Sequence, residues 1–148
     1  KLLIGEKSAE QIKIELSNVM PNNPPEESRV RGRDLVTGLP KEIILTEEDI
    51  HDAIHLSADS LFEAVKEVLE STPPEIVSDI MTHGIYLSGG GALIKNLDVA
   101  FTEYLGITVK VAHDPLTAVA RGAGMIAANA DQYRDLIIEN EDELPIRR

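Results

Sequence analysis

The strongest hydrophobic pattern in the chain follows Thr46, where apolar residues recur three and four positions apart as far as Leu69. This spacing places them on one face of an α-helix and predicts a helix to about Ser71. Thr46 and Asp49 stand three positions apart, as in a capping box that starts a helix. The apolar positions are Ile50, Ala53, Ile54, Ala58, Leu61, Phe62, Val65, Val68 and Leu69.

Weaker patterns precede this helix. Ser8 and Gln11 form a second capping-box pattern, and apolar residues at helical spacing predict a first helix over residues 8–19. Two strand-like runs follow at residues 28–35 and 41–45. Because a glycine- and proline-containing stretch separates them, they predict a β-hairpin with a longer loop.

Beyond the long helix, Thr72, Pro73 and Pro74 predict a cap and first turn for a short helix that ends near Ile80. From Gly84 the pattern alternates between strands and helices. Such alternation favours a parallel sheet and an α/β fold. The expected elements are a strand at 85–88, a glycine turn at 89–91, a helix at 93–105, a strand at 108–112 and a helix at 115–129. The acidic run at 139–143 is expected to be mobile.

Composition narrows the class of protein. With 148 residues and 43% hydrophobic content, the chain can form one core or two small subdomains. No apolar run reaches the roughly 18 residues of a membrane span, and the N-terminal residues do not read as a signal peptide. The absence of cysteine excludes disulfides and thiolate metal sites. We expect a soluble, cytoplasmic chain without direct membrane binding.

The net charge of -12 makes nucleic acid an unfavourable partner, because phosphate backbones are repelled. A nucleotide is still compatible with this charge, since local backbone N–H groups can hold a small anion. Arg29, Arg31 and Arg33 form one basic cluster beside acidic residues. We interpret it as a mixed-charge strand surface and not as an anion-binding patch.

Two sets of residues are candidates for contact with a nucleotide. Gly89, Gly90 and Gly91 follow a predicted strand and open a predicted helix, whose N-terminal N–H groups and dipole favour negative charge. A tight turn that binds nothing explains the same glycines, which match neither the P-loop nor the dinucleotide-binding spacing. Glu10 and Lys13 are neighbours on the first helix, either as a solvated ion pair or as a ribose and adenine contact.

Catalytic and metal sites are not predicted. His51 and His55 stand four apart, but Asp52 lies where a zinc protease has glutamate, so we predict no metal. There is no cysteine and no G-x-S-x-G elbow for nucleophilic catalysis. The adjacent acidic pairs are expected to lie in solvated segments and to display charge; they are Glu26 with Glu27 and Glu47 with Glu48.

Read together, several segments resemble the MreB family of bacterial actin-like, rod-shape-determining proteins. The resemblance covers residues 1 to about 127, in order and with few gaps. The segments are GEKSAEQIKIE at 5–15, VRGRDLVTGLP at 30–40, TPPE at 72–75, GGGAL at 89–93 and DPLTAVARGAG at 114–124.

The resemblance implies a cofactor and a site. In this family two lobes clamp ATP and Mg²⁺ between two phosphate loops. Glu10 and Lys13 match the helix that touches ribose and adenine, and Gly89, Gly90 and Gly91 match the adenosine-side loop. The resemblance places the family's phosphate loops, its metal-holding aspartate and the acid that positions water upstream of Lys1. We therefore expect weak or no ATP or ADP binding by this chain, no catalytic residue and no hydrolysis.

The resemblance also implies a fold and a division. The chain is expected to be part of the second lobe of an actin-like ATPase, with the ribonuclease H-like fold and a small α+β subdomain. Residues 1–52 resemble the later part of the small subdomain, and residues 53–114 the latter half of the nucleotide-proximal subdomain. Residues 115–148 resemble the helix and tail that return toward the first lobe.

The function implied for the longer protein is that of a slow cytoskeletal ATPase. Its nucleotide-dependent filaments would lie at the inner membrane and organise cell-wall synthesis in rod-shaped cells. The expected partners are further copies of itself and a RodZ-like membrane adaptor, and this segment alone is expected to form a homodimer. The alternatives are an Hsp70-type chaperone, a sugar kinase of the same fold, or a free-standing binding module.

Overall fold

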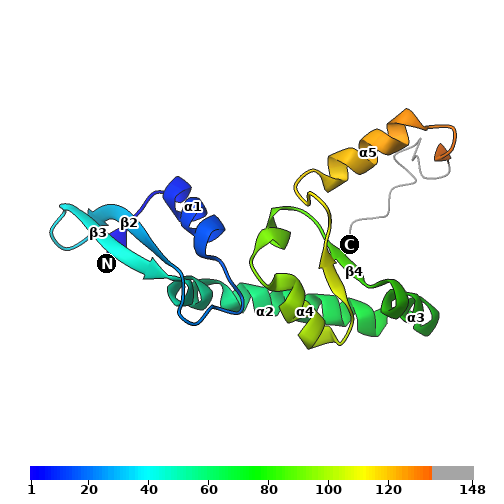
Figure 1. The fold of residues 1–148 in the computed structure, drawn as a ribbon, viewed down its shortest axis with the longest axis horizontal. Coiled ribbons are helices and arrows are strands. Elements are labelled where there is room, and N and C mark those ends of the chain that lie inside the picture. The colour runs from blue at the N-terminus through cyan, green and yellow to red at the C-terminus, as the bar shows by residue number, and fades with distance from the viewer. Residues whose placement is uncertain (135–148) are drawn as a thin grey trace.

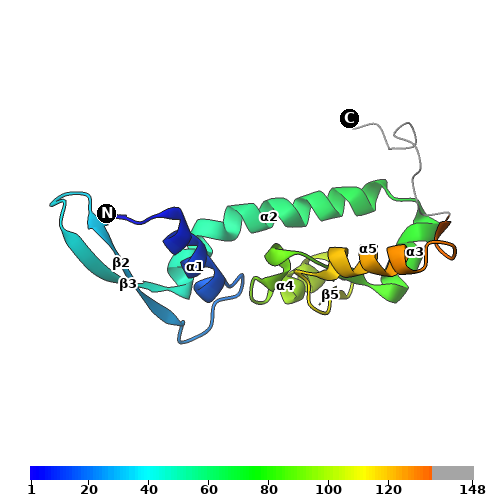
Figure 2. The ribbon, with the colours of Figure 1, turned by 90° about the horizontal axis from the view of Figure 1, so that it is seen from above.

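The computed structural model describes residues 1–134, which form two packing modules joined by one long helix (Figures 1 and 2). The N-terminal module, residues 1–46, carries a small antiparallel sheet and one helix. The C-terminal module, residues 74–112, carries a parallel strand pair with its helices. The long helix α2 starts at the N-terminal module and runs along the C-terminal one (Figures 1 and 2). The acidic run at 139–143 lies outside the described residues.

The N-terminal module is built on the predicted hairpin. Strands β2 (Glu27–Asp34) and β3 (Pro40–Thr46) pair antiparallel, and the short strand β1 (Leu2–Leu3) pairs with the end of β2. Helix α1 (Glu6–Leu16) packs on the sheet through the buried side chains of Ile12 and Leu16, which meet Val30. The hairpin prediction is confirmed.

The predicted start and end of the first helix were wrong. Gly5 is the N-cap of α1 and makes no side-chain cap, so Ser8 lies inside the helix. The helix ends at Leu16 and not at Val19, because the chain turns extended and pairs with the other module. In this extended segment the Val19 N–H donates to the Lys95 carbonyl at 3.1 Å. A tertiary contact thus shortened the helix that local periodicity predicted.

Helix α2 (Glu47–Ser71) has the predicted capping box. The Thr46 hydroxyl accepts from the Asp49 N–H at 3.2 Å, and the Asp49 carboxylate accepts from the Thr46 N–H at 2.9 Å. Its first turn contributes Ile50 to the N-terminal core, and Phe62 and Val65 pack in the second core. Although α2 is long, no helix among residues 1–134 is apolar enough to cross a bilayer.

The C-terminal module confirms the predicted parallel pair. Strands β4 (Ile85–Leu87) and β5 (Val109–Val111) pair in parallel, with helices α3 (Pro74–His83) and α4 (Leu97–Leu105) in the same module. The core is formed by Leu97, Phe101 and Val109, and the Phe62 ring meets Phe101 edge-on at 4.6 Å. A proline opens α3 as predicted, but the helix begins at Pro74 with Pro73 as its N-cap, one residue later than a cap at Thr72 implies.

Two predicted helices begin later than expected. The glycine loop opens only a short 3-10 helix, η1 (Gly90–Leu93), and α4 starts after a break in which Asn96 is left-handed at φ 60°. Helix α5 (Ala118–Ala128) follows a turn and projects away from the sheets in Figure 1.

Candidate functional site

A cavity of about 340 Å³ lies where α1 faces the glycine loop. This volume is at the lower end of the range for small-molecule sites, roughly 300–1,000 Å³. The cavity brings together Glu10, Lys13, Gly90 and Gly91, which the sequence proposed as one site, whereas Gly89 does not line it. The remaining lining residues are Ile14, Ser17, Leu93, Ile94 and Leu116.

The α1 wall presents a charged pair at the cavity mouth. The Lys13 ammonium lies 2.7 Å from the Glu10 carboxylate, and both side chains are about half exposed, at 49% and 57%. Such an exposed pair contributes little to stability, about 0.3–0.5 kcal/mol for helix neighbours. Its geometry leaves the ammonium available to a ligand oxygen, because Lys has two further donors.

The opposite wall is backbone, because Gly90 and Gly91 carry no side chain. A Cβ added at Gly90 would meet a Leu116 methyl at 3.5 Å, and one at Gly91 would meet nothing within 4 Å. Gly89 does not line the cavity but has a structural role: it adopts φ 84°, and its N–H donates to the Pro115 carbonyl at 2.8 Å. This bond holds the segment before α5 against the glycine loop and so brings Leu116 to the cavity.

The prediction that the glycines open a helix whose dipole attracts negative charge was wrong. The helix that the glycines open has only four residues and is separated from α4 by residues 94–96. A macrodipole needs a longer run of aligned peptide units than one turn provides. Any attraction for a ligand at this wall therefore comes from individual N–H groups and from close backbone approach.

Sequence reasoning missed Ser17. Ser17 is 3% exposed and is among the residues that line the cavity, and its hydroxyl, which has almost no accessible surface, has no hydrogen-bond partner among the described residues. A buried hydroxyl without a partner is unfavourable by about 1–3 kcal/mol, so an orphan of this kind beside a cavity needs an explanation. The available signal was its position four residues after Lys13, on the same side of the chain.

Apolar side chains complete the cavity. Ile14 is 71% exposed, and Leu93 and Leu116 are also exposed around the cavity. Exposed apolar groups beside a few directed polar groups are typical of a site for a flat, partly apolar ligand.

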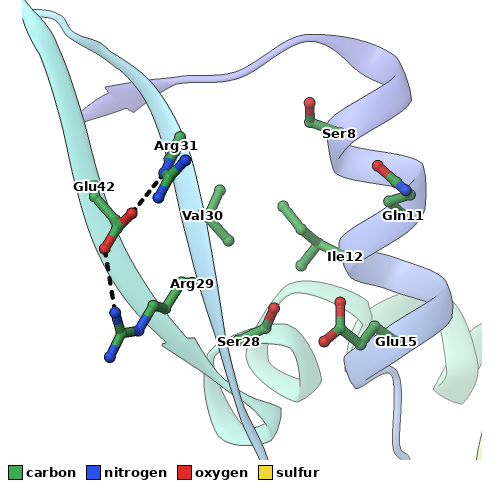
Figure 3. A pocket seen from close by; sticks show the side chains of 9 residues that line it. All are labelled: Ser8, Gln11, Ile12, Glu15, Ser28, Arg29, Val30, Arg31 and Glu42. Carbon is green, nitrogen blue, oxygen red and sulfur yellow. Dashed lines mark hydrogen bonds and ion pairs between the residues drawn. The ribbon is translucent and has the colours of Figure 1, made fainter.

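A second cavity, about 370 Å³, lies between α1 and the hairpin and involves Arg29 and Arg31 (Figure 3). The Glu42 carboxylate lies 2.6 Å from Arg31 Nε and 3.9 Å from Arg29. Its hydrogen bond and charge raise the pKa of Arg31, and the same pair lowers the pKa of Glu42. Both arginines are thus already paired with a carboxylate, in agreement with the predicted mixed-charge surface.

The histidine pair shows backbone contacts. The His51 and His55 rings stack at 6.1 Å, and each Nδ1 lies within hydrogen-bond distance of a backbone carbonyl, of Asn18 and Asp52 respectively. Within residues 1–134 no group of three or more His, Cys, Asp or Glu side chains is placed to hold a metal ion.

The predicted display of charge by Glu47 was wrong. Its side chain is fully buried, and its carboxylate accepts hydrogen bonds from Asn18 and Asn22. Glu26, another of the four acidic residues predicted to be solvated, is exposed but pairs with Lys95 at 2.7 Å.

Solved structures that resemble this chain define its class. MreB5 of Spiroplasma citri, solved with bound ADP, matches with a TM-score of 0.83 at 34% identity, over 90% of this chain and 41% of that one. A double helical filament of MamK matches the fold with a TM-score of 0.70 at 24% identity, over 86% of this chain and 38% of that one. The chain is therefore part of an α/β protein with the actin-like fold.

The family follows from sequence. Residues 1–135 match the model of the MreB/Mbl protein family. The cell shape-determining protein Mbl of Bacillus cereus is 44% identical over 132 residues, which cover 89% of this chain and 40% of that protein. The cell shape-determining protein MreB of Escherichia coli is 44% identical over 131 residues, covering 88% and 38%. The chain belongs to the MreB/Mbl family, as its motifs predicted, which decides against the chaperone and sugar-kinase alternatives. It spans about 40% of the length of these relatives.

Proposed function

We propose that the cavity between α1 and the glycine loop binds the adenosine part of ATP or ADP, within a longer actin-like ATPase of the MreB/Mbl family. The observation that carries the proposal is the meeting of Glu10, Lys13, Gly90 and Gly91 at one cavity, from segments far apart in the chain. The related MreB5 structures, solved with ADP and with AMPPNP, support the same ligand class.

The residues present fit an adenosine moiety. The Lys13 ammonium and Glu10 carboxylate suit ribose hydroxyls and ring nitrogens, since one donates and the other accepts. The buried Ser17 hydroxyl would gain the partner it lacks. Ile14 and Leu93 offer apolar surface to the base, and the missing Cβ atoms of the glycines leave room for close backbone approach.

Bound ATP supplies a phosphoryl group and, with Mg²⁺, the chemistry of hydrolysis. The described residues offer no ligand cluster for Mg²⁺. We assign to this chain only the binding and orientation of the adenosine. The phosphate loops and the acid that positions water are proposed to belong to other parts of the longer protein, which would be a slow ATPase.

The wider role remains part of the proposal. The longer protein would form nucleotide-dependent filaments at the inner membrane and maintain rod shape by organising cell-wall synthesis, with a RodZ-like adaptor as partner. Residues 1–52 would belong to the small subdomain, 53–114 to the nucleotide-proximal subdomain and 115–148 to the return toward the first lobe. The names of the curated relatives as cell shape-determining proteins support this role.

Nucleotide titration followed by NMR tests the site. We expect ATP to bind the 148-residue chain no tighter than about 1 mM, near -4 kcal/mol, because we assign the phosphate contacts to other parts of the longer protein. The amide signals of Ser17, Gly90 and Gly91 should shift. Lys13→Ala should weaken binding by about 1–3 kcal/mol, since a charged hydrogen bond is lost.

Lys66→Ala is the matched control, because Lys66 also forms an exposed pair with the glutamate three residues before it, at 3.8 Å. It should leave the titration unchanged. ATP-induced shifts confined to surfaces away from the cavity would refute the site. A micromolar dissociation constant, or phosphate release by this chain that Lys13→Ala abolishes, would contradict the assignment of the phosphate contacts to other segments.

A further inference from the structure

The two walls of the cavity belong to different modules and meet at a short backbone junction. The Lys95 N–H donates to the Ser17 carbonyl at 3.2 Å, and the Val19 N–H donates to the Lys95 carbonyl at 3.1 Å. Ser17 and Ile94 line the cavity, so this junction lies directly behind them. The relative position of the walls therefore depends on what holds residues 17–19 against residue 95.

Behind the junction lies the buried carboxylate of Glu47, the first residue of α2. It accepts from the Asn18 side chain at 3.2 Å, and from the backbone and side-chain amides of Asn22 at 2.9 and 3.2 Å. The Lys95 ammonium lies 3.5 Å away and also pairs with Glu26. One carboxylate thus contacts both sides of the junction.

Asn18 carries the connection onward. Its side-chain oxygen accepts from the Asn96 side chain at 2.8 Å and from the Met20 N–H at 3.0 Å. Asn96 adopts the left-handed backbone that separates η1 from α4. A continuous polar chain therefore runs from α2 through Asn18, which follows α1, to the segment that follows the glycine loop.

A fully buried carboxylate is unfavourable unless donors surround it. Burial alone raises the pKa of Glu47, but the hydrogen bonds from Asn22, Asn18 and Lys95 outweigh burial and hold it below its ordinary value. An apolar residue at this position would leave the donors of Asn18 and Asn22 without an acceptor. The carboxylate orients several donors at once.

We propose that Glu47 is a positioning residue for the cavity: by holding Asn18 and Lys95 together, it sets the distance between the α1 wall and the glycine-loop wall. The inference rests on the proposed function only in naming an adenine nucleotide as the ligand. Val19 and Ile94 add apolar contacts at the same junction, where they pack against the second core.

Glu47→Gln tests this role, with Glu48→Gln as the matched control. The control removes the same charge from the same helical turn, but its side chain is exposed. In Glu47→Gln an NH₂ group replaces one acceptor oxygen among donors. We expect the Val19 and Lys95 amides to exchange about tenfold faster or more, and ATP to bind about tenfold more weakly, because bonds to a buried charge are lost. Exchange at the core amide of Val30 should be unchanged, which a merely structural role would not give.

Asn96→Gly provides a second variant. Glycine adopts the left-handed backbone without strain, so the fold is kept while the link to Asn18 is cut. We expect weaker ATP binding with an unchanged melting temperature. If Glu47→Gln does not fold, Asn96→Gly decides the question.

Each outcome separates the two proposals. If both variants match Glu48→Gln in amide exchange and in ATP affinity, the positioning role is refuted. If uniform destabilisation explains every change, including exchange at Val30, the role is also refuted. If ATP shifts amide signals of the unaltered chain only at surfaces away from the cavity, the proposed function fails. The exchange at Val19 and Lys95 then still tests whether Glu47 holds the junction.

Discussion

Replacing the buried Ser17 by alanine should make the chain more stable and its nucleotide binding weaker. The two effects have one cause. The Ser17 hydroxyl is buried without a partner among the described residues, and Ser17 is one of the residues that line the cavity at which we place the ligand. The hydroxyl therefore lowers the stability of the free chain but strengthens ligand binding, a trade-off that is common at binding sites.

The magnitude follows from burial. Ser17 is 3% exposed, so its hydroxyl has lost nearly all contact with water. Removing such an unsatisfied group stabilises a protein by about 1–3 kcal/mol. Helix propensity adds nothing, because Ser17 is the extended residue that follows α1. A hydrogen bond to the ligand contributes about 0.5–1.5 kcal/mol, so its loss should raise the dissociation constant roughly 2- to 13-fold.

Urea unfolding and ATP titration measure the two effects on the same protein. Ser17→Ala should raise the urea midpoint without changing the slope, and should raise the melting temperature by roughly 2–4 °C for each kcal/mol. The exposed Ser57 on α2 provides the control Ser57→Ala, which should leave ATP affinity unchanged and should raise stability only through helix propensity, by less than about 0.7 kcal/mol. A less stable Ser17→Ala variant would show that the hydroxyl is satisfied in the free chain. Unchanged affinity would show that it does not meet the ligand.

Three further outcomes are expected. Gly90→Val should preserve the fold, because a Cβ at this position makes only ordinary contact with Leu116. The added side chain should fill the cavity and weaken ATP binding in titrations by about 1–3 kcal/mol. Unchanged affinity would exclude Gly90 from the site. Hydrogen bonds from Val36 and Lys41 lower the pKa of Asp34 from 3.8 to about 2. The ionised Asp34 carboxylate therefore stabilises the fold fully above about pH 4, and this stabilisation is lost as pH falls toward 2. The gap in urea midpoint between the unaltered chain and Asp34→Asn should therefore close over that range, and a constant gap would contradict it. The edge of β4 and the apolar residues of α5 should support a dimer, and light scattering that gives a monomer mass at every concentration would refute it.

Local sequence patterns predicted the elements whose causes lie within a few residues. The capping box of Thr46 and Asp49 depends on atoms three positions apart, and it starts α2 as predicted. The hairpin and the parallel strands also appeared with boundaries within about two residues, because strand alternation and turn residues are local signals. Motif order further identified the family and named four of the residues that line the cavity.

Tertiary contacts decided the rest. Helix α1 ends at Leu16 because the following residues pair with Lys95. The spacing of apolar residues within the helix gives no information about that distant partner. Glu47 was predicted to be a solvated carboxylate, yet packing buries it among donors from Asn18, Asn22 and Lys95. The Asn18 and Asn96 side chains meet across 78 residues of sequence. Local periodicity reports which face of an element is apolar, whereas burial of a polar atom depends on every segment that packs around it. The sequence by itself therefore determined the elements, the family and the candidate residues, and only the tertiary structure revealed the orphaned hydroxyl and the carboxylate behind the cavity.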